Sequence, residues 1–296
     1  TNSVVAFKDA TVRVIATGPN NEDLCRSCVA IDKSGSFTVG NAPYKNWRRY
    51  APNIVVSAKR LMGASISDPQ VQKMKADKDM YPYGISKMSG GTDESVVVIM
   101  NGKEYTPEQI SAEILRQLKN DASVKLGGDV THAVITVPAY FNEKQKSATR
   151  KAAELAGLKV QRLLAEPTAA AISYGADKMA ADEDKIFLVY DFGGGTFDLS
   201  ILVASGGNFI ESGTGGDRWL GGDDIDRLIS EYVLSEAGKA NNVDIHKLIE
   251  ELPERKKYAF QGELKDNVES VKKTLSQSES ATISIFDQLE DEDGSP

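Results

Sequence analysis

The chain has 296 residues, 41% of them hydrophobic and 26% charged, a composition that is ordinary for a globular protein with room for two sizeable cores. Its net charge of −8 argues against a nucleic-acid partner, which would require a basic surface. That charge suits a cytoplasmic protein, which is the location we expect. No apolar run reaches the length that crosses a membrane, so we expect no membrane partner.

The first residues indicate an internal duplication. Residues 1–7 and 196–202 share one pattern, in which a threonine and two further residues lead into a strand that we expect to be buried. Because the chain starts at Thr1 rather than at a methionine, we interpret it as a fragment or a processed product from which a first glycine-rich turn has been removed. Any targeting signal would then lie outside the sequence.

Cys25 and Cys28 are the only cysteines, and their spacing occurs in redox pairs and in halves of zinc sites. Two ligands do not complete a structural zinc site, and His132 and His246 are distant in sequence. A redox pair would sit between a strand and a helix, whereas this pair precedes the strand-like residues 29–31. We therefore predict free thiols in a reducing cytosol.

Hairpins and then alternating helices and strands are predicted next. Residues 29–40 and 96–104 alternate around Ser-Gly and Asn-Gly turns, which indicates a small sheet subdomain. A helix begins at Thr106, which can cap it, with a proline in the first position and a glutamine that closes a capping box. Its apolar stripe consists of Ile110, Ile114 and Leu118. Strands at 133–137 and 160–164 flank a helix that is capped by Asn142 and Gln145, and a further helix starts at Pro167, so we expect a sheet covered by helices.

Residues 186–198 form the most informative segment, because a strand is followed by three glycines and a second strand. The glycines are Gly193, Gly194 and Gly195. Without a Cβ, they can point successive N–H groups into one concavity that suits phosphate oxygens. Asp191, at the end of the first strand, can hold Mg²⁺ through water or position an attacking water. The alternative is an ordinary hairpin, but that needs only one glycine and no carboxylate on each side.

Glycines and charged residues of the last third are open to two interpretations. Gly221 and Gly222 precede an amphipathic helix and are either a plain turn or an anion-accepting helix start. Glu269, Lys272 and Ser276 are spaced as on one helix face, where a solvated Glu-Lys pair is the ordinary interpretation.

Other residues have simple structural interpretations. Lys59 and Arg60 can be two solvated basic residues on a helix, and Glu166 can be an N-terminal helix cap. Pro138 can merely rigidify the end of a strand. The acidic residues 288–296 are not expected to fold by themselves.

Four segments, in this order along the chain, resemble the Hsp70 family of molecular chaperones. They are residues 56–63, 135–142, 164–171 and 191–198, and the wider resemblance runs from Thr1 to about residue 285. The chain is similar to a DnaK-like nucleotide-binding domain that is truncated at both ends. The resemblance implies the α/β class and the actin-like ATPase fold, a duplicated ribonuclease H-like fold whose two lobes surround a nucleotide cleft, here incomplete. Lobe I would span residues 1–180, with a small subdomain at about 32–107, and lobe II, incomplete at its C-terminus, residues 181–296.

The resemblance also implies roles for individual residues. Lys59 would reach the γ-phosphate, where its ammonium can stabilise the charge of phosphoryl transfer. Glu166 and Asp191 would bind Mg²⁺ through water and orient the attacking water, and Thr196 would belong to the same catalytic set. Contacts with ATP or ADP are implied for Thr1, Asn2, Gly193, Gly194, Gly195, Gly221, Gly222, Glu269, Lys272 and Ser276, with the last three at the adenosine.

By the same resemblance the chain is a Mg²⁺-dependent ATPase whose turnover gates the binding of unfolded polypeptides. Clients would bind to a peptide-binding domain that lies outside the sequence, with Pro138 and the nearby Lys146 in the switch that couples the two. A J-domain co-chaperone and a nucleotide exchange factor are implied partners, in a stress response. Two other functions use the same fold, an actin-like or cell-shape filament ATPase and a sugar kinase. The segments 59–63 and 166–171 count against the filament.

Overall fold

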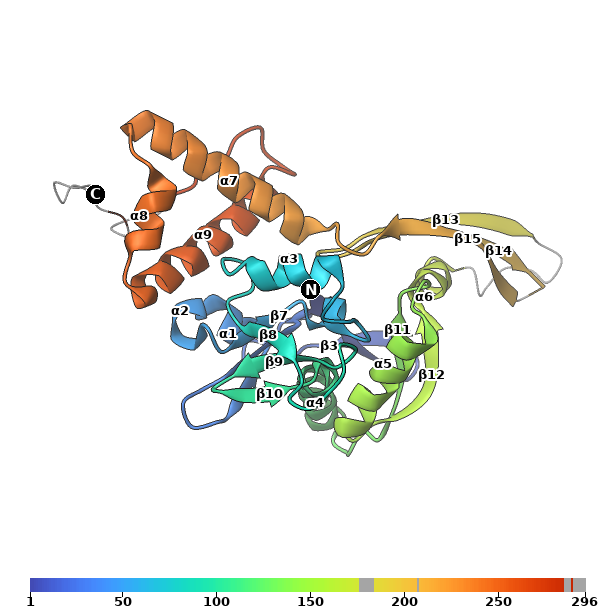
Figure 1. Cartoon of the computed structure of the whole chain (residues 1–296). Coiled ribbons are helices and arrows are strands. Elements are labelled where there is room, and N and C mark those ends of the chain that lie inside the picture. Colours follow the sequence, from blue (N-terminus) through green and yellow to red (C-terminus); the bar gives the residue numbers. More distant parts are fainter. Residues whose placement is uncertain (176–183, 207, 285–288, 290–296) are drawn as a thin grey trace.

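The structure is a computed structural model that describes residues 1–175, 184–206, 208–284 and residue 289. It is a mixed α/β protein, as predicted. Figure 1 shows a body of small sheets and helices, a three-stranded sheet that extends to one side, and three helices packed together on the other side. The expected boundary between lobes near residue 180 and, apart from Leu289, the acidic end lie outside the described residues.

The sheets of the first 105 residues are small and antiparallel. Their strands are β1 (Asn2–Ser3), β2 (Val5–Lys8), β3 (Val12–Ile15), β4 (Cys25–Arg26), β5 (Cys28–Ile31), β6 (Phe37–Val39), β7 (Ile54–Val56), β8 (Gly84–Lys87), β9 (Val96–Met100) and β10 (Lys103–Tyr105). β1 pairs with β4 and β2 with β3, while β5 lies between β6 and β7, and β9 between β10 and β8. Both predicted hairpins, β5–β6 and β9–β10, are therefore confirmed.

The strand expected to be buried near the N-terminus is only half-buried. Along β2 the side chains alternate between half-buried and exposed positions, with Val5 and Phe7 on the better covered face. The prediction of a buried strand is wrong here because, within the described part of the chain, β2 has one neighbour in its sheet.

Short helices connect these sheets, and one long helix covers them. They are α1 (Asn41–Lys45), α2 (Trp47–Tyr50), the 3₁₀ helix η1 (Ala58–Leu61), α3 (Pro69–Ala76) and α4 (Pro107–Leu126). The predicted start of α4 is confirmed, since Gln109 N donates to Thr106 Oγ1 at 3.2 Å and Thr106 N donates to Gln109 Oε1 at 2.8 Å.

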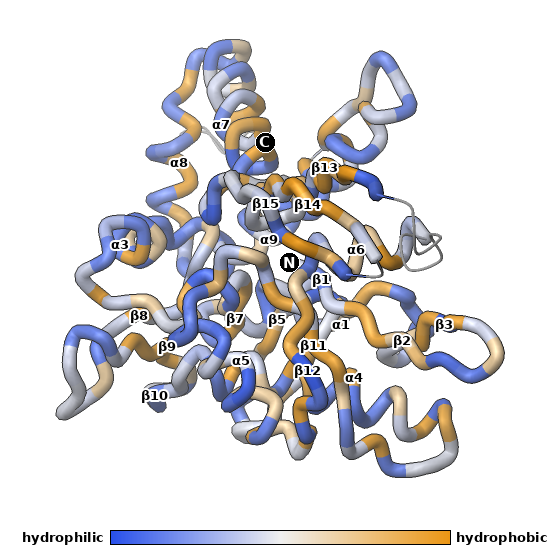
Figure 2. Tube along the Cα trace, turned by 90° about the vertical axis from the view of Figure 1, so that its right-hand side faces the viewer, coloured by the Kyte–Doolittle hydropathy of each residue, from blue (hydrophilic) through white to orange (hydrophobic). Residues whose placement is uncertain are grey.

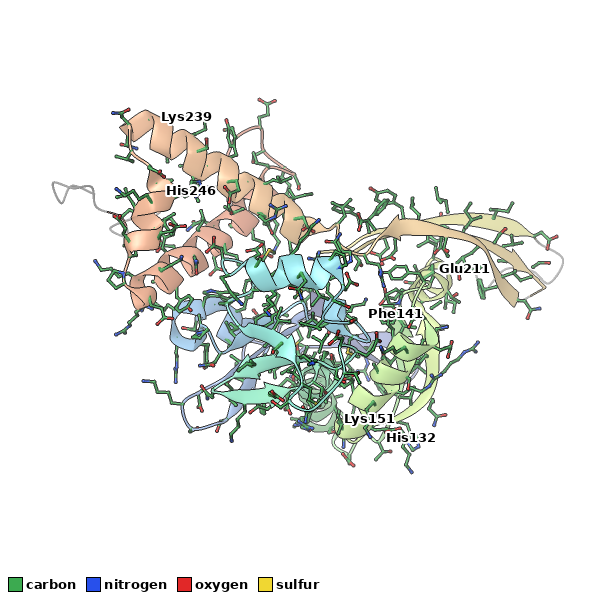
Figure 3. All side chains as sticks on the ribbon, in the orientation of Figure 1. His132, Phe141, Lys151, Glu211, Lys239 and His246 are labelled. Atoms are coloured by element: carbon green, nitrogen blue, oxygen red, sulfur yellow. The ribbon has the colours of Figure 1, made fainter. Side chains whose placement is uncertain are left out.

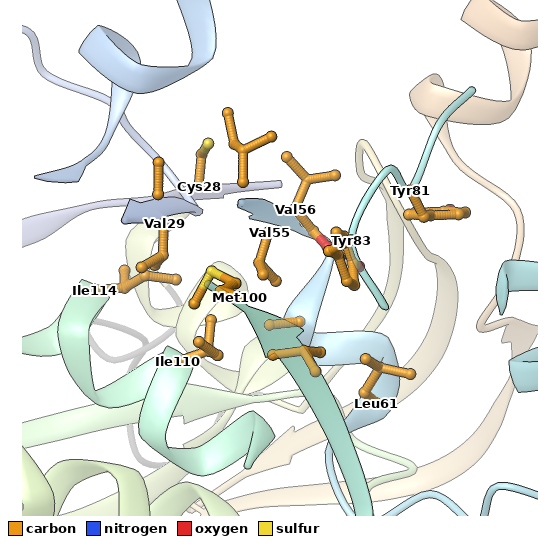
Figure 4. Packing of buried hydrophobic residues seen from close by; sticks show 14 of the residues in the cluster. Cys28, Val29, Val55, Val56, Leu61, Tyr81, Tyr83, Met100, Ile110 and Ile114 are labelled. Atoms are coloured by element: carbon orange, nitrogen blue, oxygen red, sulfur yellow. The ribbon is translucent and has the colours of Figure 1, made fainter. Parts of the chain in front are cut away.

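The main hydrophobic core lies between the β5 and β9 sheets and α4. Figure 4 shows Val29, Val55, Met100 and Tyr83 packed there, beside the Ile110 and Ile114 side chains of α4. All three residues of the predicted α4 stripe are buried. Ala58 and Leu61 of η1 are also buried in this core, which fixes the position of the intervening Lys59 and Arg60.

The predicted strand–helix–strand unit is confirmed. β11 (His132–Val137) and β12 (Lys159–Ala165) are parallel, and α5 (Glu143–Leu155) connects them. The capping box of Asn142 and Gln145 is present at the start of α5. α6 (Glu166–Ser173) follows β12 without a loop, so Glu166 lies at the carboxyl end of a parallel strand.

The glycine-rich segment lies in an antiparallel sheet of β13 (Lys185–Phe192), β14 (Phe197–Ser205) and β15 (Asn208–Asp217). Phe187 and Val189 pack with Ala171 of α6 and Leu202 of β14. Alternate residues of β13 face solvent, namely Ile186, Leu188 and Tyr190, which are 74%, 68% and 65% exposed. The prediction that this strand is buried is therefore wrong, because only one of its faces packs. The apolar colouring of β13 and β14 is visible in Figure 2.

The three remaining helices, α7 (Gly222–Asn241), α8 (Ile245–Glu251) and α9 (Glu254–Thr274), form a second core. Its buried residues are Leu234, Ile249, Phe260, Leu264 and Val268. The helix predicted after Gly222 is confirmed as α7. Its expected apolar stripe is not buried as a whole, since Ile225, Leu228 and Tyr232 are 36%, 61% and 68% exposed. Across the part of the chain that the structure describes, none of the helices combines the length and the apolar character needed to cross a membrane.

Candidate functional site

Three carboxylates meet where three elements begin or end. Glu166 starts α6, Asp191 is close to the end of β13, and Asp198 is close to the start of β14. Because β13 and β14 place Asp191 directly opposite Asp198, their side chains share one face of the sheet. One oxygen of each carboxylate lies within 4.8 Å of the other two. Oxygen ligands of this kind are the ones that Mg²⁺ prefers, so this acidic cluster fits a Mg²⁺ ion.

Asp198 is the least solvated member of the acidic cluster. The residue is 8% exposed, and neither carboxylate oxygen accepts a well-formed hydrogen bond in the described part of the chain. Burial raises the pKa of Asp198, and the charges of Glu166 and Asp191 raise it further, against the nearby Thr196 hydroxyl and Lys59. A buried carboxylate without a well-formed hydrogen bond is costly, and a cation would offset that cost. In the sequence, Asp198 is only the carboxylate that follows the glycines, and no role is predicted for it.

Lys59 reaches the acidic cluster from the N-terminal half. Its Nζ lies 3.0 Å from Glu166 Oε1, and its side chain is 44% exposed. The ammonium is also 5.8 Å from the ring centre of Phe141, which Figure 3 labels beneath the start of the β13–β15 sheet. The fold therefore brings together Lys59, Glu166 and Asp191, which the sequence analysis selected from distant segments.

The loop of residues 193–196, called here the glycine loop, is fixed by hydrogen bonds from the start of α7 to its carbonyl groups. Gly193 N donates to Thr196 O at 2.9 Å and closes the turn. Gly193 O accepts from Gly222 N at 3.0 Å, and Gly194 O accepts from Asp223 N at 2.7 Å. The amides of Gly194 and Gly195 have no protein acceptor within the described residues. Turning the carbonyls away leaves these two N–H groups available to an anion, as in a phosphate-binding nest.

The start of α7 is the support of the glycine loop. The amides of Gly222 and Asp223 are used by loop carbonyls, and Gly221 N donates to Asp224 Oδ2 at 2.9 Å. A Cβ on Gly221 would lie 2.5 Å from the carbonyl carbon of Gly194, so only glycine allows this approach. The sequence left a plain turn and an anion-accepting helix start as interpretations of Gly221 and Gly222. The structure shows a third role, in which the two glycines pack against the glycine loop.

Arg60 is a further support that the sequence analysis left without a role. Its guanidinium donates to Gly195 O through Nη2 at 2.7 Å and through Nε at 3.1 Å. Nη2 also lies 3.0 Å from Asp224 Oδ2, and Nη1 donates to the Tyr81 hydroxyl at 2.8 Å. With its side chain 6% exposed, Arg60 ties η1 to both the glycine loop and α7. No local pattern distinguishes it from a surface arginine.

Thr1 lies against the glycine loop, as the expected phosphate contact requires. A Cβ on Gly194 would come within 2.4 Å of Thr1 Oγ1, so the second glycine is needed for this approach. Thr1 O accepts from Ser27 N at 2.8 Å. Asn2 directly follows Thr1, the residue that contacts the glycine loop, and it pairs with Arg26 across β1 and β4.

The α9 residues expected at the adenosine have separate partners. Lys272 Nζ donates to Gly222 O at 2.9 Å and lies 2.8 Å from Asp226 Oδ1. Glu269 accepts from the Arg26 guanidinium and, at 2.7 Å, from Lys273 Nζ. Burial alone would raise the pKa of Glu269, but Lys273 and Arg26 lower it to about 2. Glu269 and Lys272 are therefore not a solvated pair with each other but two contacts of α9 with neighbouring elements.

Ser276 and the expected switch residues are less closely tied to the site. α9 ends at Thr274, so Ser276 lies past the helix and is exposed, and the face expected to join it to Glu269 and Lys272 does not extend so far. Pro138 is buried directly after β11, and Lys146 pairs with Glu143 at 3.0 Å.

Both cysteines are free and buried, in agreement with the prediction of free thiols. Burial raises the pKa of Cys25 to about 11 and that of Cys28 to about 12, so neither is a reactive thiolate near neutral pH. His132 and His246 are exposed and lie in separate parts of the molecule in Figure 3. The described residues therefore give these cysteines no histidine partner for a zinc site.

The arrangement as a whole suits an anhydride of phosphoric acid. The glycine loop offers two amides, Lys59 offers a positive charge, and the acidic cluster offers oxygen ligands for a divalent cation, all on adjoining elements. Among protein families, the one described as "Hsp70 protein" matches residues 1–294 of the chain.

Proposed function

The chain belongs to the Hsp70 family, and from this premise we propose that it is a Mg²⁺-dependent ATP-binding and ATP-hydrolysing domain. The observation that carries the proposal is the contact of the glycine loop with Thr1 on one side and with α7 on the other, next to the acidic cluster. A protein with only a structural hairpin at this position would not need two unpaired amides beside three converging carboxylates.

Hydrolysis would consist mainly of positioning and charge stabilisation. The amides of Gly194 and Gly195, with Thr1 and Thr196, would bind phosphate oxygens, and the Lys59 ammonium would stabilise the γ-phosphate as charge develops on it. Asp191, Asp198 and Glu166 would hold Mg²⁺, directly or through water, and the ion would supply charge neutralisation for the phosphates. The carboxylates not used by the ion can orient a water molecule toward the γ-phosphorus. None of these groups is a strong base, so we expect slow turnover.

The adenosine would lie along α9, near Glu269, Lys272 and Ser276, and near Asn2, whose strand partner Arg26 donates to Glu269. Glu269 and Lys272 support this placement because each already joins α9 to an element next to the glycine loop, Arg26 of β4 and Gly222 of α7. Ser276 is exposed and follows the helix, where a ribose or base could reach it.

We further propose that the chain forms two lobes around this cleft and that nucleotide turnover gates the binding of unfolded polypeptides. The DnaK-like resemblance supports clients bound by a separate peptide-binding domain, a J-domain co-chaperone and a nucleotide exchange factor, in the cytoplasm and under stress. Pro138 is buried and lies two residues before Tyr140, which lines a cavity together with Lys59, so it would be placed to respond to the γ-phosphate.

Titration calorimetry of the full-length protein with ATP tests the ATPase proposal. We expect binding that weakens when EDTA removes Mg²⁺, and steady ADP formation at a slow rate. A protein that binds no adenine nucleotide would contradict the proposal. ATP-dependent pelleting would instead favour the filament alternative, and a hexose-dependent rise in ADP production the sugar kinase.

Replacing Lys272 with alanine tests the placement of adenosine. We expect ATP affinity to fall at least about tenfold, or roughly 1.4 kcal/mol. The melting temperature should also fall, because Asp226, with its side chain 12% exposed, would lose its ion-pair partner. The double variant Lys272→Ala with Asp226→Asn separates the two effects, since it leaves no unpaired carboxylate. Normal ATP affinity in this double variant would contradict the adenosine assignment.

A further inference from the structure

A cavity of about 290 Å³ lies beside the acidic cluster, and the nucleotide contacts proposed above use only one side of it. That side consists of Lys59 and Thr196. The other walls come from Arg60 and residues 63–65, from Asp68 and Glu94, from residues 140–142, 144 and 145, and from the turn of Arg218 and Trp219 between β15 and α7. Since one water takes up about 30 Å³ in the liquid, the cavity has room for a small hydrated anion.

Cations outnumber carboxylates around this cavity. Lys59, Arg60, Lys144 and Arg218 line it, against Asp68 and Glu94. Three of the cations already have ion-pair partners. Lys59 pairs with Glu166, Arg60 with Asp224, and Lys144 with Glu94. Arg218 has no carboxylate partner in the part of the chain that the structure describes. The unpaired charge of the cavity is therefore that of Arg218.

The turn that carries Arg218 is fixed on both sides. Asp217 Oδ1 accepts from Trp219 N at 2.8 Å, and the Trp219 ring lies 5.4 Å from the guanidinium carbon of Arg60. Burial and the charges of Asp198 and Glu166 raise the pKa of Tyr140, whereas the charge of Arg218 lowers it. The Tyr140 phenol is thus close enough to both the acidic cluster and Arg218 for the charges of each to act on it, so it lies between them.

We propose that this cavity receives the orthophosphate product and that Arg218 binds it there. The inference rests on the proposed ATPase function. Hydrolysis forms a bond between water oxygen and the γ-phosphorus, breaks the bond from that phosphorus to the β,γ-bridging oxygen, and leaves ADP, orthophosphate and a proton. A guanidinium can donate two parallel N–H bonds to the orthophosphate anion. Lys59 and Thr196 lie between the acidic cluster and the cavity, so the orthophosphate would pass from the Lys59 ammonium to the Arg218 guanidinium.

Calorimetric titration of inorganic phosphate into the full-length protein, saturated with ADP and Mg²⁺, tests the inference. We expect Arg218→Ala to weaken phosphate binding about tenfold, as for the loss of one charge-assisted hydrogen-bonding group. Phosphate release, followed with a fluorescent phosphate sensor in a single turnover, should become faster by a similar factor. Arg218→Lys should retain part of the affinity. The matched control is Arg227→Ala, which removes an exposed arginine of α7 outside this cavity.

Failure of this inference is distinguishable from failure of the proposed function. If the unaltered protein binds ADP but binds no phosphate at millimolar concentrations, or if Arg218→Ala leaves phosphate affinity unchanged, the inference is wrong while the ATPase proposal stands. If the unaltered protein binds no adenine nucleotide, both are wrong. Because Arg218 is exposed, we expect the melting temperature to be unchanged in every variant. A loss of phosphate affinity would then be due to the missing guanidinium and not to unfolding.

Discussion

Asp198→Asn should lower single-turnover ATP hydrolysis by about 10²-fold or more, the scale for removing one preorganised charge from a reacting phosphoryl group. Asp198 is the buried member of the acidic cluster and has no well-formed hydrogen bond of its own, so its charge is available to a cation. The Mg²⁺ concentration that supports half-maximal hydrolysis should therefore rise as well. Quenched-flow measurement of ADP over a Mg²⁺ series gives both quantities.

The same substitution should stabilise the protein when nucleotide and metal are absent. The folded-state pKa of Asp198 is raised above its ordinary value of 3.8, so the folded state disfavours the charged carboxylate. This destabilising contribution is absent below the unfolded-state pKa and grows as pH rises through the raised folded-state pKa. The melting temperature of Asp198→Asn should thus exceed that of the unaltered protein at neutral pH, and the difference should shrink toward pH 3.8.

A surface aspartate is the control for this pair of measurements. Asp129, whose side chain is 68% exposed, pairs with Lys119 at 3.3 Å, and Asp129→Asn should change neither hydrolysis nor melting temperature appreciably. A normal hydrolysis rate in Asp198→Asn would remove Asp198 from the metal site. A lower melting temperature at neutral pH would show instead that the carboxylate stabilises the fold.

Lys59→Ala should also lower single-turnover hydrolysis by about 10²-fold or more while ATP still binds. The ammonium lies 3.0 Å from Glu166, so its removal takes away the positive charge expected at the γ-phosphate and frees a carboxylate that then repels it. Binding should survive because the glycine loop amides and the α9 contacts do not depend on Lys59. Single-turnover kinetics and calorimetry of the full-length protein measure the two separately.

Lys151→Ala is the matched control for Lys59. Lys151 is an exposed lysine of α5 that pairs with Glu154 at 3.4 Å, and Figure 3 shows it at the periphery of the molecule. It should behave like the unaltered protein. Equal hydrolysis rates in Lys59→Ala and Lys151→Ala would mean that Lys59 is an ordinary surface lysine.

Features that depend on neighbours in sequence could be predicted from the sequence. The capping boxes at Thr106 and Asn142, the buried stripe of α4 and the two hairpins all depend on residues within a few positions of one another, and all are present. The three glycines similarly predict a loop with free amides, because the lack of Cβ atoms is a property of the residues themselves. Asp191 could likewise be selected locally, because it ends a strand just before the glycines, whereas Lys59 and Glu166 were selected by resemblance and not by any local pattern.

The burial of strands was decided by tertiary structure. The apolar residues of β13 predict burial on both faces, yet Ile186 and Leu188 face solvent because the described elements pack against only one face. The apolar residues of a strand make its burial favourable. Whether another element packs on each face depends on distant parts of the chain.

Partners at the site were likewise decided only by the fold. Arg60 looks like a surface arginine, yet it holds Gly195 O, and Asp198 looks like an ordinary strand residue, yet it is the buried carboxylate of the acidic cluster. Lys272 and Glu269 are spaced to pair with each other on one helix, but Asp226 and Arg26 lie closer to them in the folded chain. The sequence by itself determined local backbone conformation and the types of chemical group available. Which charge meets which was determined by tertiary structure, because a charged side chain takes its partner from whatever the packing of distant segments brings within a few ångströms.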